Sequence, residues 1–465
     1  MLSAEEKGLA KECLRTALEA GAQKARVSLS KSNMNLVSTL NAEVDKISSC
    51  MDRSMEISIF ADGRFGSFST NKLETGSLRS FIGNAVQTVR MLAPDPCRDL
   101  PDRDRQVKGP LTGRELGLFD DSCAELTAER RREYALQAAV KTKSGDGWKL
   151  VSEEGEYSDT QEFSYIADTG GLEAEHHETC ISYGVETTIK NSRGRKYSSY
   201  WWDSTPLLRD FDPEGIGRKA LQLAVERLGS RRVKGGKYNM VLDAEFAYKV
   251  VSPVLRALNG YSIQQGNSFL AGSAGKQVFP QGMTLLDCPH IKGQTGSRLF
   301  DSEGVATHGH AIIENGVVRE YFLNTYMANK LGMEPTQEDA IRPVLLRYPS
   351  DGSSPSVPEG FAQDAVACRH PSAFGRTELM RLCGDGILVT GFNGGNSNSA
   401  TGNFSYGIEG FLFKDGNIVR PVNGMLVTGN FLSLWAGFIA SGDDARPCQD
   451  KLIPSLAFRD VDFSG

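Results

Sequence analysis

The stretch GFLFKDGNIVRP, residues 410–421, places Asp415-Gly416 between two runs of apolar residues. An Asp-Gly or Asn-Gly pair between such runs is typical of a two-residue β-hairpin turn, because both residues tolerate positive φ. The same arrangement recurs around Asn315-Gly316 in HAIIENGVVREYF, residues 310–322. Glycine is dense in this part of the chain, as tight turns between many short strands require. The range 236–465 is therefore predicted to be a β-rich domain of barrel or sandwich type.

Two other features are expected within that domain. The spacing of apolar residues predicts one helix over Ala244–Leu258, interrupted by Pro253 because proline lacks the N–H that a helix interior uses. A polar, proline-containing segment, YPSDGSSPSVPEG, predicts a loop at residues 348–360.

The first 110 residues combine helix and strand patterns. Apolar residues at helical spacing predict a first helix, whose inward face is formed by Leu9, Cys13, Leu14, Ala17 and Leu18. Alternation predicts strands at residues 24–30 and 54–60, and helical spacing returns over Glu74–Leu92. The charged, proline-rich residues 93–110 indicate an exposed connector. Residues 1–110 are therefore predicted to be an N-terminal α+β domain with a mixed sheet and helices.

Residues 111–235 are predicted to be a middle α+β region. A helix is expected near Thr127–Val140, and short strands are expected around Leu150, 163–167 and 181–189. A second helix is expected after Asp212, an N-cap residue followed by Pro213 in the first turn. The predicted fold class of the whole chain is α+β.

Composition excludes some classes of function. The 465 residues carry a formal net charge of −6, so no large basic field favours direct nucleic-acid binding. Nine cysteines without C-x-x-C spacing suit a reducing compartment. No window approaches 18 apolar residues, and the first residues lack the apolar core of a signal peptide. We expect a cytoplasmic protein without a membrane span.

Two histidine pairs are candidate metal ligands. In EAEHHETC, residues 173–180, an expected strand directs His176 and His177 to opposite faces, where they cannot share one ion; solvent-facing polar residues are the favoured interpretation. His308 and His310 in THGH share one face of a strand and can support a two-histidine site, but no third ligand is evident. His370, beside a proline, is interpreted as a loop residue.

The run GFNGGNSNSATGNFSYG, residues 391–407, is rich in glycine, amides and hydroxyls. Such a run can offer backbone N–H groups to a peptide or an oxyanion. A long ordered turn between two strands explains it equally well, and the sequence leaves both interpretations open.

Two long segments carry a family resemblance. LFDSEGVATHGHAIIENGVVREYFLNTYMANKLG (299–332) and the run from GILVTGFNGGNSNS to GMLVTGNF (386–431) resemble the TldD/PmbA family, long labelled modulators of DNA gyrase. In that family a TldD-type subunit holds zinc through H-E-x-x-x-H on a helix and a distant cysteine, and hydrolyses peptides. A PmbA-type (TldE) subunit lacks these residues and pairs with TldD.

The resemblance implies that this chain is of the PmbA/TldE type. Ser252 stands near the first histidine, Pro253 near the glutamate, and Arg256 or Ala257 near the second histidine. Ser441 stands in the place of the cysteine, and Cys448 follows seven residues later. No metal ligand or catalytic residue is therefore assigned to this chain, and zinc is expected in a TldD-type partner.

By this resemblance we expect a subunit of a metallopeptidase complex that acts on unfolded or modified peptides, as a heterodimer with a TldD-type subunit, a homodimer, or both. Six residues are candidate substrate contacts: Asp301, Glu303, Asn403, Phe404, Ser405 and Gly407. An alternative role for the two acids is structural, in which they only hold turns by accepting backbone hydrogen bonds. Two alternatives remain open: a self-contained hydrolase that uses Asp301, Glu303, His308 and His310, and a non-catalytic interaction protein.

Overall fold

The computed structural model describes residues 2–109, 111–346 and 374–465. It divides into two compact units. Unit 1 consists of Met1–Gln222, Lys292–Thr307 and Asn324–Glu338, and unit 2 of Leu223–Ile291, His308–Leu323 and Asp339–Gly465. The predicted loop at 348–360 and His370 lie outside the described residues.

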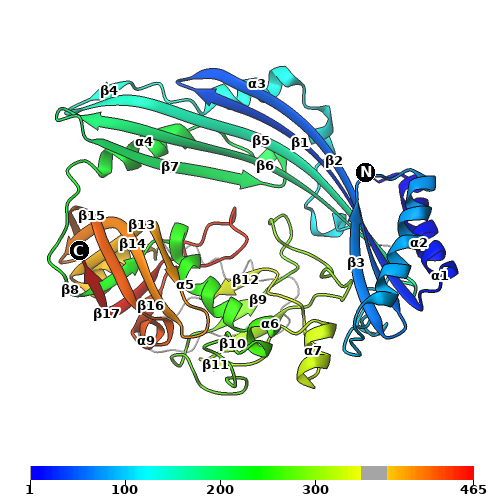
Figure 1. Ribbon diagram of the computed structural model, residues 1–465. Coiled ribbons are helices and arrows are strands. Elements are labelled where there is room, and N and C mark those ends of the chain that lie inside the picture. The colour runs from blue at the N-terminus through cyan, green and yellow to red at the C-terminus, as the bar shows by residue number, and fades with distance from the viewer. Residues whose placement is uncertain (1, 110, 347–373) are drawn as a thin grey trace. The chain divides into compact units, whose positions relative to one another are not determined.

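Unit 1 is built on one long antiparallel sheet with the strand order β3-β2-β1-β5-β6-β7, and the short β4 pairs with β5 (Figure 1). The bounds are β1 Lys24–Leu40, β2 Glu43–Ala61, β3 Arg64–Thr70, β4 Ser144–Gly145, β5 Trp148–Asp168, β6 Glu173–Asn191 and β7 Lys196–Thr205. β1 pairs with β5 from Arg26 to Leu40. The ranges 1–110 and 111–235 thus contribute strands to the same sheet, and β5 and β6 are much longer than the short strands expected.

Two helices pack on one end of this sheet, α1 (Ala4–Glu19) and α2 (Thr75–Met91) (Figure 1). Ser3 and Glu6 form a capping box that satisfies the first N–H groups of α1. The inward faces of both helices and alternate residues of β1, β2 and β5 form one continuous apolar core. Both predicted helices are confirmed, although Leu18, which was expected on the buried face of α1, is 45% exposed.

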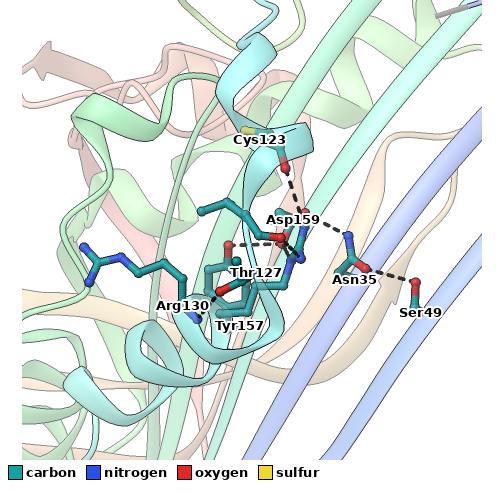
Figure 2. A network of polar contacts seen from close by, with 9 residues as sticks. Asn35, Ser49, Cys123, Thr127, Arg130, Tyr157 and Asp159 are labelled. Carbon is teal, nitrogen blue, oxygen red and sulfur yellow. Dashed lines mark hydrogen bonds and ion pairs between the residues drawn. The ribbon is translucent and has the colours of Figure 1, made fainter.

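The third predicted helix is confirmed as α3 (Ala128–Gln137), which begins after an N-cap at Thr127. A buried polar network ties it to the sheet (Figure 2). Arg131 on α3 donates to both carboxylate oxygens of Asp159 on β5, at 2.6 and 3.1 Å. Tyr157 and Asn35 donate to the same carboxylate at 3.1 and 3.0 Å. Asp159 therefore fixes α3 against β1 and β5 through four charge-assisted hydrogen bonds.

The fourth helix, α4 (Ile216–Glu226), starts three residues later than Pro213, where the sequence predicts its first turn. Asp212 accepts a hydrogen bond from the N–H of Glu214 at 2.9 Å, so it closes a turn before the helix rather than capping it. Gly215 lies between this turn and the first residue of α4. Its φ of 87° is a left-handed conformation that a continuous right-handed helix cannot contain.

Unit 2 contains a closed barrel. β8, β13, β14, β15 and β17 form a ring, because β15 pairs with the end of β17. β16 pairs with the start of β17, on the edge that β15 pairs with further along. The bounds are β8 Gly236–Leu242, β13 Gly386–Ser397, β14 Asn403–Lys414, β15 Asn417–Asn430, β16 Phe438–Ser441 and β17 Leu456–Ser464. The prediction of a β-rich barrel or sandwich is thus confirmed as a barrel. Asp415, at φ 49°, and Gly416 form the predicted turn between β14 and β15.

A smaller sheet of unit 2 has the order β11-β10-β9-β12. Its strands are β9 Leu285–Asp287, β10 His310–Glu314, β11 Val317–Val318 and β12 Pro343–Leu345. Asn315-Gly316 forms the predicted hairpin turn between β10 and β11.

The helices of the C-terminal half are more numerous than the sequence predicts. α5 (Ala244–Ala257) matches the one expected helix, but it runs through Pro253 without interruption. Four short helices were not predicted: α6 Gly260–Gln264, α7 Thr325–Leu331, α8 Arg376–Cys383 and α9 Phe431–Ala436. Within the described ranges, no helix is long and apolar enough to cross a membrane.

Candidate functional site

Helix α5 carries the positions that the family resemblance aligns with a zinc-binding helix. It begins at an N-cap, Asp243, whose carboxylate accepts the N–H of Glu245 at 3.1 Å. Ser252 and Pro253 are half-buried, Arg256 is exposed and Ala257 is fully buried. Pro253 removes one backbone donor from the helix interior, and none of these four side chains is of a type that coordinates zinc in proteins.

Ser441, aligned with the zinc-binding cysteine, lies at the end of β16. Its side chain is fully buried, and its hydroxyl donates to the carbonyl of Leu346 at 3.2 Å. Cys448, seven residues later, is also buried. In the described part of the chain, no three His, Cys, Asp or Glu side chains are grouped so that they could hold a metal ion.

The loop after Ser441 is fastened to the first turn of α5, a feature that the sequence interpretation missed. Asp444 accepts the N–H and the hydroxyl of Ser455, both at 2.8 Å. The Ser455 hydroxyl oxygen in turn accepts the N–H of Ala244 at 3.0 Å. Burial raises the pKa of Asp444, although the hydrogen bonds from Ser455 oppose that shift. These partners lie as far as 211 residues apart in sequence, so no local signal announces them.

A second set of contacts secures the same loop. Arg446 forms an ion pair with Glu245, and Gln449 donates to the backbone oxygen of Glu245 at 3.2 Å. Arg376, at the start of α8, donates to Asp243 at 2.6 Å. The start of α5 and the loop at 441–449 are therefore held in one fixed arrangement.

Asp301 and Glu303 lie together in one turn of unit 1. Asp301 Oδ1 accepts the N–H groups of Glu303 and Val305, each at 2.9 Å. Glu303 accepts both the N–H and the hydroxyl of Thr325 at 2.8 Å, at the start of α7. Burial, with the nearby carboxylates of Glu338 and Glu303, raises the pKa of Asp301 to about 7. Both side chains are buried, and both hold backbone turns.

The other four candidate contacts lie on β14 in unit 2, so the structure does not place all six in one unit. Asn403 is exposed, Ser405 is half-buried, and Phe404 and Gly407 are buried. The Phe404 ring stacks on Phe431 with centroids 4.8 Å apart. β14 pairs with β13 on one side and β15 on the other. The glycine-rich run at 391–407 therefore forms the ends of two paired strands and the turn at 398–402 between them.

His308 and His310 are neighbours in unit 2, with ring centroids 5.2 Å apart. Only His310 lies on a strand, β10. Its Nε2 lies 2.8 Å from a carboxylate oxygen of Glu320. Burial lowers the pKa of His310, but Glu320 and Asp287 outweigh this effect and the net shift is upward. His310 is thus engaged by a carboxylate.

His176 and His177 occupy successive positions on β6 and so point to opposite faces, as predicted. The expectation that they face solvent is wrong, because their exposures are only 4% and 3%. Residues 111–118 run along this part of β6: Leu111 and Thr112 accept the N–H groups of Glu175 and His177. Phe119 and Phe163 contact the His177 ring, and burial lowers its pKa.

Comparisons with known proteins agree over most of the chain. Residues 121–228 match the PmbA/TldA metallopeptidase central domain, and residues 235–465 match the PmbA/TldA metallopeptidase C-terminal domain. The metalloprotease PmbA of Escherichia coli O157:H7 is 25% identical over 460 residues, which are 97% of this chain and 96% of that protein.

Two crystal structures share the fold. One, from Bacteroides thetaiotaomicron and described as a candidate modulator of DNA gyrase, is 36% identical, covers 100% of both chains and has a TM-score of 0.90. TldE from Thermococcus kodakarensis is 18% identical, covers 98% of this chain and 100% of its own, and has a TM-score of 0.77. The family models and the full-length likeness at 36% identity show that this chain belongs to the TldD/PmbA family of metallopeptidase-like proteins.

Proposed function

We propose that this chain is a TldE-type subunit that has no zinc of its own and works with a TldD-type subunit, which supplies the metal and cleaves the peptide. The observation that carries the proposal is the side-chain chemistry on α5 and β16. Serine, proline, arginine or alanine, and again serine occupy the positions that need two imidazoles, a carboxylate and a thiolate.

The environment of Ser441 supports the same proposal. Its hydroxyl is buried and donates to Leu346, so an ion at this position would have to break that bond. The names of two relatives, metalloprotease PmbA and TldE, agree with a subunit of this kind. The eight cysteines that the structure describes are all free, which suits the cytoplasm.

Peptide substrates are expected to be unfolded or modified, and to contact this chain through Asn403 and Ser405. These are the accessible members of the β14 set. Because β14 is hydrogen-bonded on both sides, a peptide cannot add to it as a further strand. Contacts would therefore be made by side chains. Phe404 would support this part of β14 by stacking on Phe431, and Gly407 is a buried backbone position of the same strand.

The self-contained hydrolase remains the less favoured alternative. It would use Asp301, Glu303, His308 and His310. Both carboxylates already accept hydrogen bonds, Asp301 from the backbone and Glu303 from Thr325, and His310 is engaged by Glu320. Asp301 and Glu303 are accordingly proposed as structural residues, in line with the second interpretation of the sequence.

The test measures zinc by elemental analysis and cleavage of an unfolded peptide for the chain alone and for two mixtures. The first mixture adds a TldD-type subunit, and the second adds that subunit after its H-E-x-x-x-H glutamate is replaced by glutamine. The TldD-type subunit alone is the reference for cleavage. For the chain alone we expect neither zinc nor cleavage. The first mixture should contain zinc and cleave the peptide, and the second mixture should contain zinc without cleaving the peptide. Stoichiometric zinc in the lone chain, or cleavage in the second mixture, would contradict the proposal. A non-catalytic interaction protein would leave cleavage by the TldD-type subunit unchanged.

A further inference from the structure

In the part of the chain that the structure describes, half of strand β2 has an outer edge without a strand neighbour. On its inner side β2 pairs with β1 from Glu43 to Phe60. On its outer side β3 covers only Met55–Ala61 (Figure 1). Among the described residues, no strand pairs with the outer edge of residues 43–54. A free edge of this length is a template for pairing with another chain, and proteins normally shorten or cover such edges.

Two large apolar side chains of this edge segment, residues 43–54, are exposed. Ile47 is 57% exposed and Met51 is 66% exposed. Both lie on the sheet face that carries α1, α2 and α3, because they pair with Val37 and Asn33 of β1. Two large apolar side chains on one face of an open edge indicate a surface that is covered in the working protein.

The edge segment is held rigidly before any partner arrives. Asn41 and Ala42 form the tight turn from β1, with φ 55° and 69°. The N–H of Asn41 donates to the carbonyl of Glu153 at 2.8 Å, and the N–H of Glu153 donates to the Asn41 side chain at 3.2 Å. A strand whose conformation is already fixed loses little entropy on pairing.

The order of charges along the edge segment identifies the partner. Residues 45–53 read DKISSCMDR. If this segment is laid antiparallel against a second copy with Ser49 opposite Ser49, Lys46 faces Asp52, Asp45 faces Arg53, and Ile47 faces Met51. Each pair occurs twice by symmetry. Directly opposite residues share a face of the sheet, so the four charged residues within 45–53 meet their opposites and Ile47 meets Met51. Glu43 falls outside this pairing, because its counterpart Met55 already pairs with β3.

We propose that the edge segment of β2 pairs with the same segment of a second copy of this chain, in an antiparallel, two-fold register centred on Ser49. The joint sheet would then continue across the symmetry axis, as an isologous interface requires. Arg53 also lies 3.6 Å from Glu6 of its own chain, but its side chain remains 52% exposed and can turn toward the second copy. This proposal goes beyond the proposed function and does not depend on which subunit holds zinc.

Disulfide trapping tests the register. Cys50 is exposed, so both variants are made in a Cys50→Ser background. Ser49→Cys places two thiols opposite each other at the axis, and mild oxidation should give a covalent dimer in high yield. The matched control, Ser54→Cys, lies five residues from the axis, which separates the two thiols by about 33 Å. It should give none. Equal yields, or no dimer from Ser49→Cys, would overturn the register.

A charge exchange tests the interface without a covalent bond. Lys46→Glu places like charges opposite each other at two symmetric positions and should weaken dimerisation about ten-fold. The double variant Lys46→Glu/Asp52→Lys reverses both charges and should restore it. Sedimentation velocity over a range of concentrations gives the dissociation constants. Self-pairing would be refuted by a monomeric wild-type chain, or by a double variant that dimerises as weakly as the single variant. Pairing only with a TldD-type subunit would assign the edge to that partner instead.

Discussion

Two arginine–aspartate pairs of unit 1 each form two hydrogen bonds but have different surroundings. Arg131 contacts Asp159 at 2.6 and 3.1 Å, and Arg114 contacts Asp121 at 2.7 and 2.9 Å. The first pair is buried, with side-chain exposures of 14% and 2%, whereas Asp121 is 71% exposed. Water compensates a broken pair only where it has access, so the energetic cost of losing one partner must differ.

We therefore expect Asp159→Ala to lower the free energy of unfolding by about 3–5 kcal/mol, because it leaves the Arg131 guanidinium buried without its counter-charge. Asp121→Ala removes an equivalent carboxylate at the surface and should cost at most about 1 kcal/mol. Urea denaturation followed by circular dichroism measures both. Similar losses in the two variants would show that burial does not determine the strength of this network.

Asp301 gives stability a pH dependence of unusual sign for an aspartate. Burial and the carboxylates of Glu338 and Glu303 raise its pKa to about 7 in the folded chain, against about 4 when unfolded. Between these values the folded state binds more protons, so the contribution of Asp301 is fully present below pH 4 and is lost as pH rises through 7. The difference in stability between wild type and Asp301→Asn should therefore shift in favour of the variant from pH 5 to pH 7.5.

Urea unfolding at the two pH values measures this shift, and an aspartate with the opposite environment provides the control. Burial raises the pKa of Asp120, but hydrogen bonds from Ser122 and Leu208 outweigh it and the net shift is downward. Asp120→Asn should therefore cost stability at neutral pH, and this cost should disappear in acid. A pH-independent difference for Asp301→Asn would mean that its carboxyl is not protonated in the folded chain.

At the scale of helices and strands, the spacing of apolar residues within one segment predicted the helices that depend on that segment alone. The apolar spacing over 74–92 located α2 to within one residue at each end, and α3 lies where a helix was expected near Thr127–Val140. Pairing between distant strands left no such signal, so the union of β1 with β5 in one sheet was not predicted. The burial of His176 and His177 likewise depends on residues 111–118, which lie more than 50 positions away. The positions on α5 that correspond to a zinc-binding helix were inferred from the family resemblance and not from the spacing of residues.

Two helical glycines make the role of packing measurable. A Cβ atom on Gly217 of α4 would lie 2.2 Å from the carbonyl oxygen of Ala138, whereas one on Gly83 of α2 would meet nothing within 4 Å. Alanine is the better helix former by about 1 kcal/mol, so Gly83→Ala should stabilise the chain by up to that amount. Gly217→Ala should destabilise it by about 1–3 kcal/mol, because backbone must move.

Thermal unfolding of the two glycine variants beside wild type gives the comparison directly. We expect the midpoint to rise for Gly83→Ala and to fall for Gly217→Ala. A rise in both would mean that helix propensity outweighs the contact at Ala138, and that the start of α4 can shift without loss.

At the scale of the whole molecule, unit 1 is completed by segments from the second half of the sequence. Phe300 packs in one apolar cluster with Ile166, Leu172 and Ala174. Nearby, Val107 donates its N–H to Gly304 at 3.0 Å, and Ala306 donates to Arg105 at 2.9 Å. Phe300 lies 95 positions after Thr205, the end of β7 and of this sheet's last strand, so the first 222 residues cannot complete this cluster alone.

We expect a fragment of residues 1–222 to bind the hydrophobic dye ANS and to unfold at a lower temperature than the full chain, because Ile166 and Leu172 lose the cover of Phe300. Phe300→Ala in the full chain isolates that contact and should cost about 3–4 kcal/mol. Adding a peptide of residues 292–307 to the fragment should reduce dye binding, since it returns Phe300 and the backbone partners of residues 105–107. A fragment that is as stable as the full chain and binds no dye would show that unit 1 folds independently, and that the later segments dock on a finished surface.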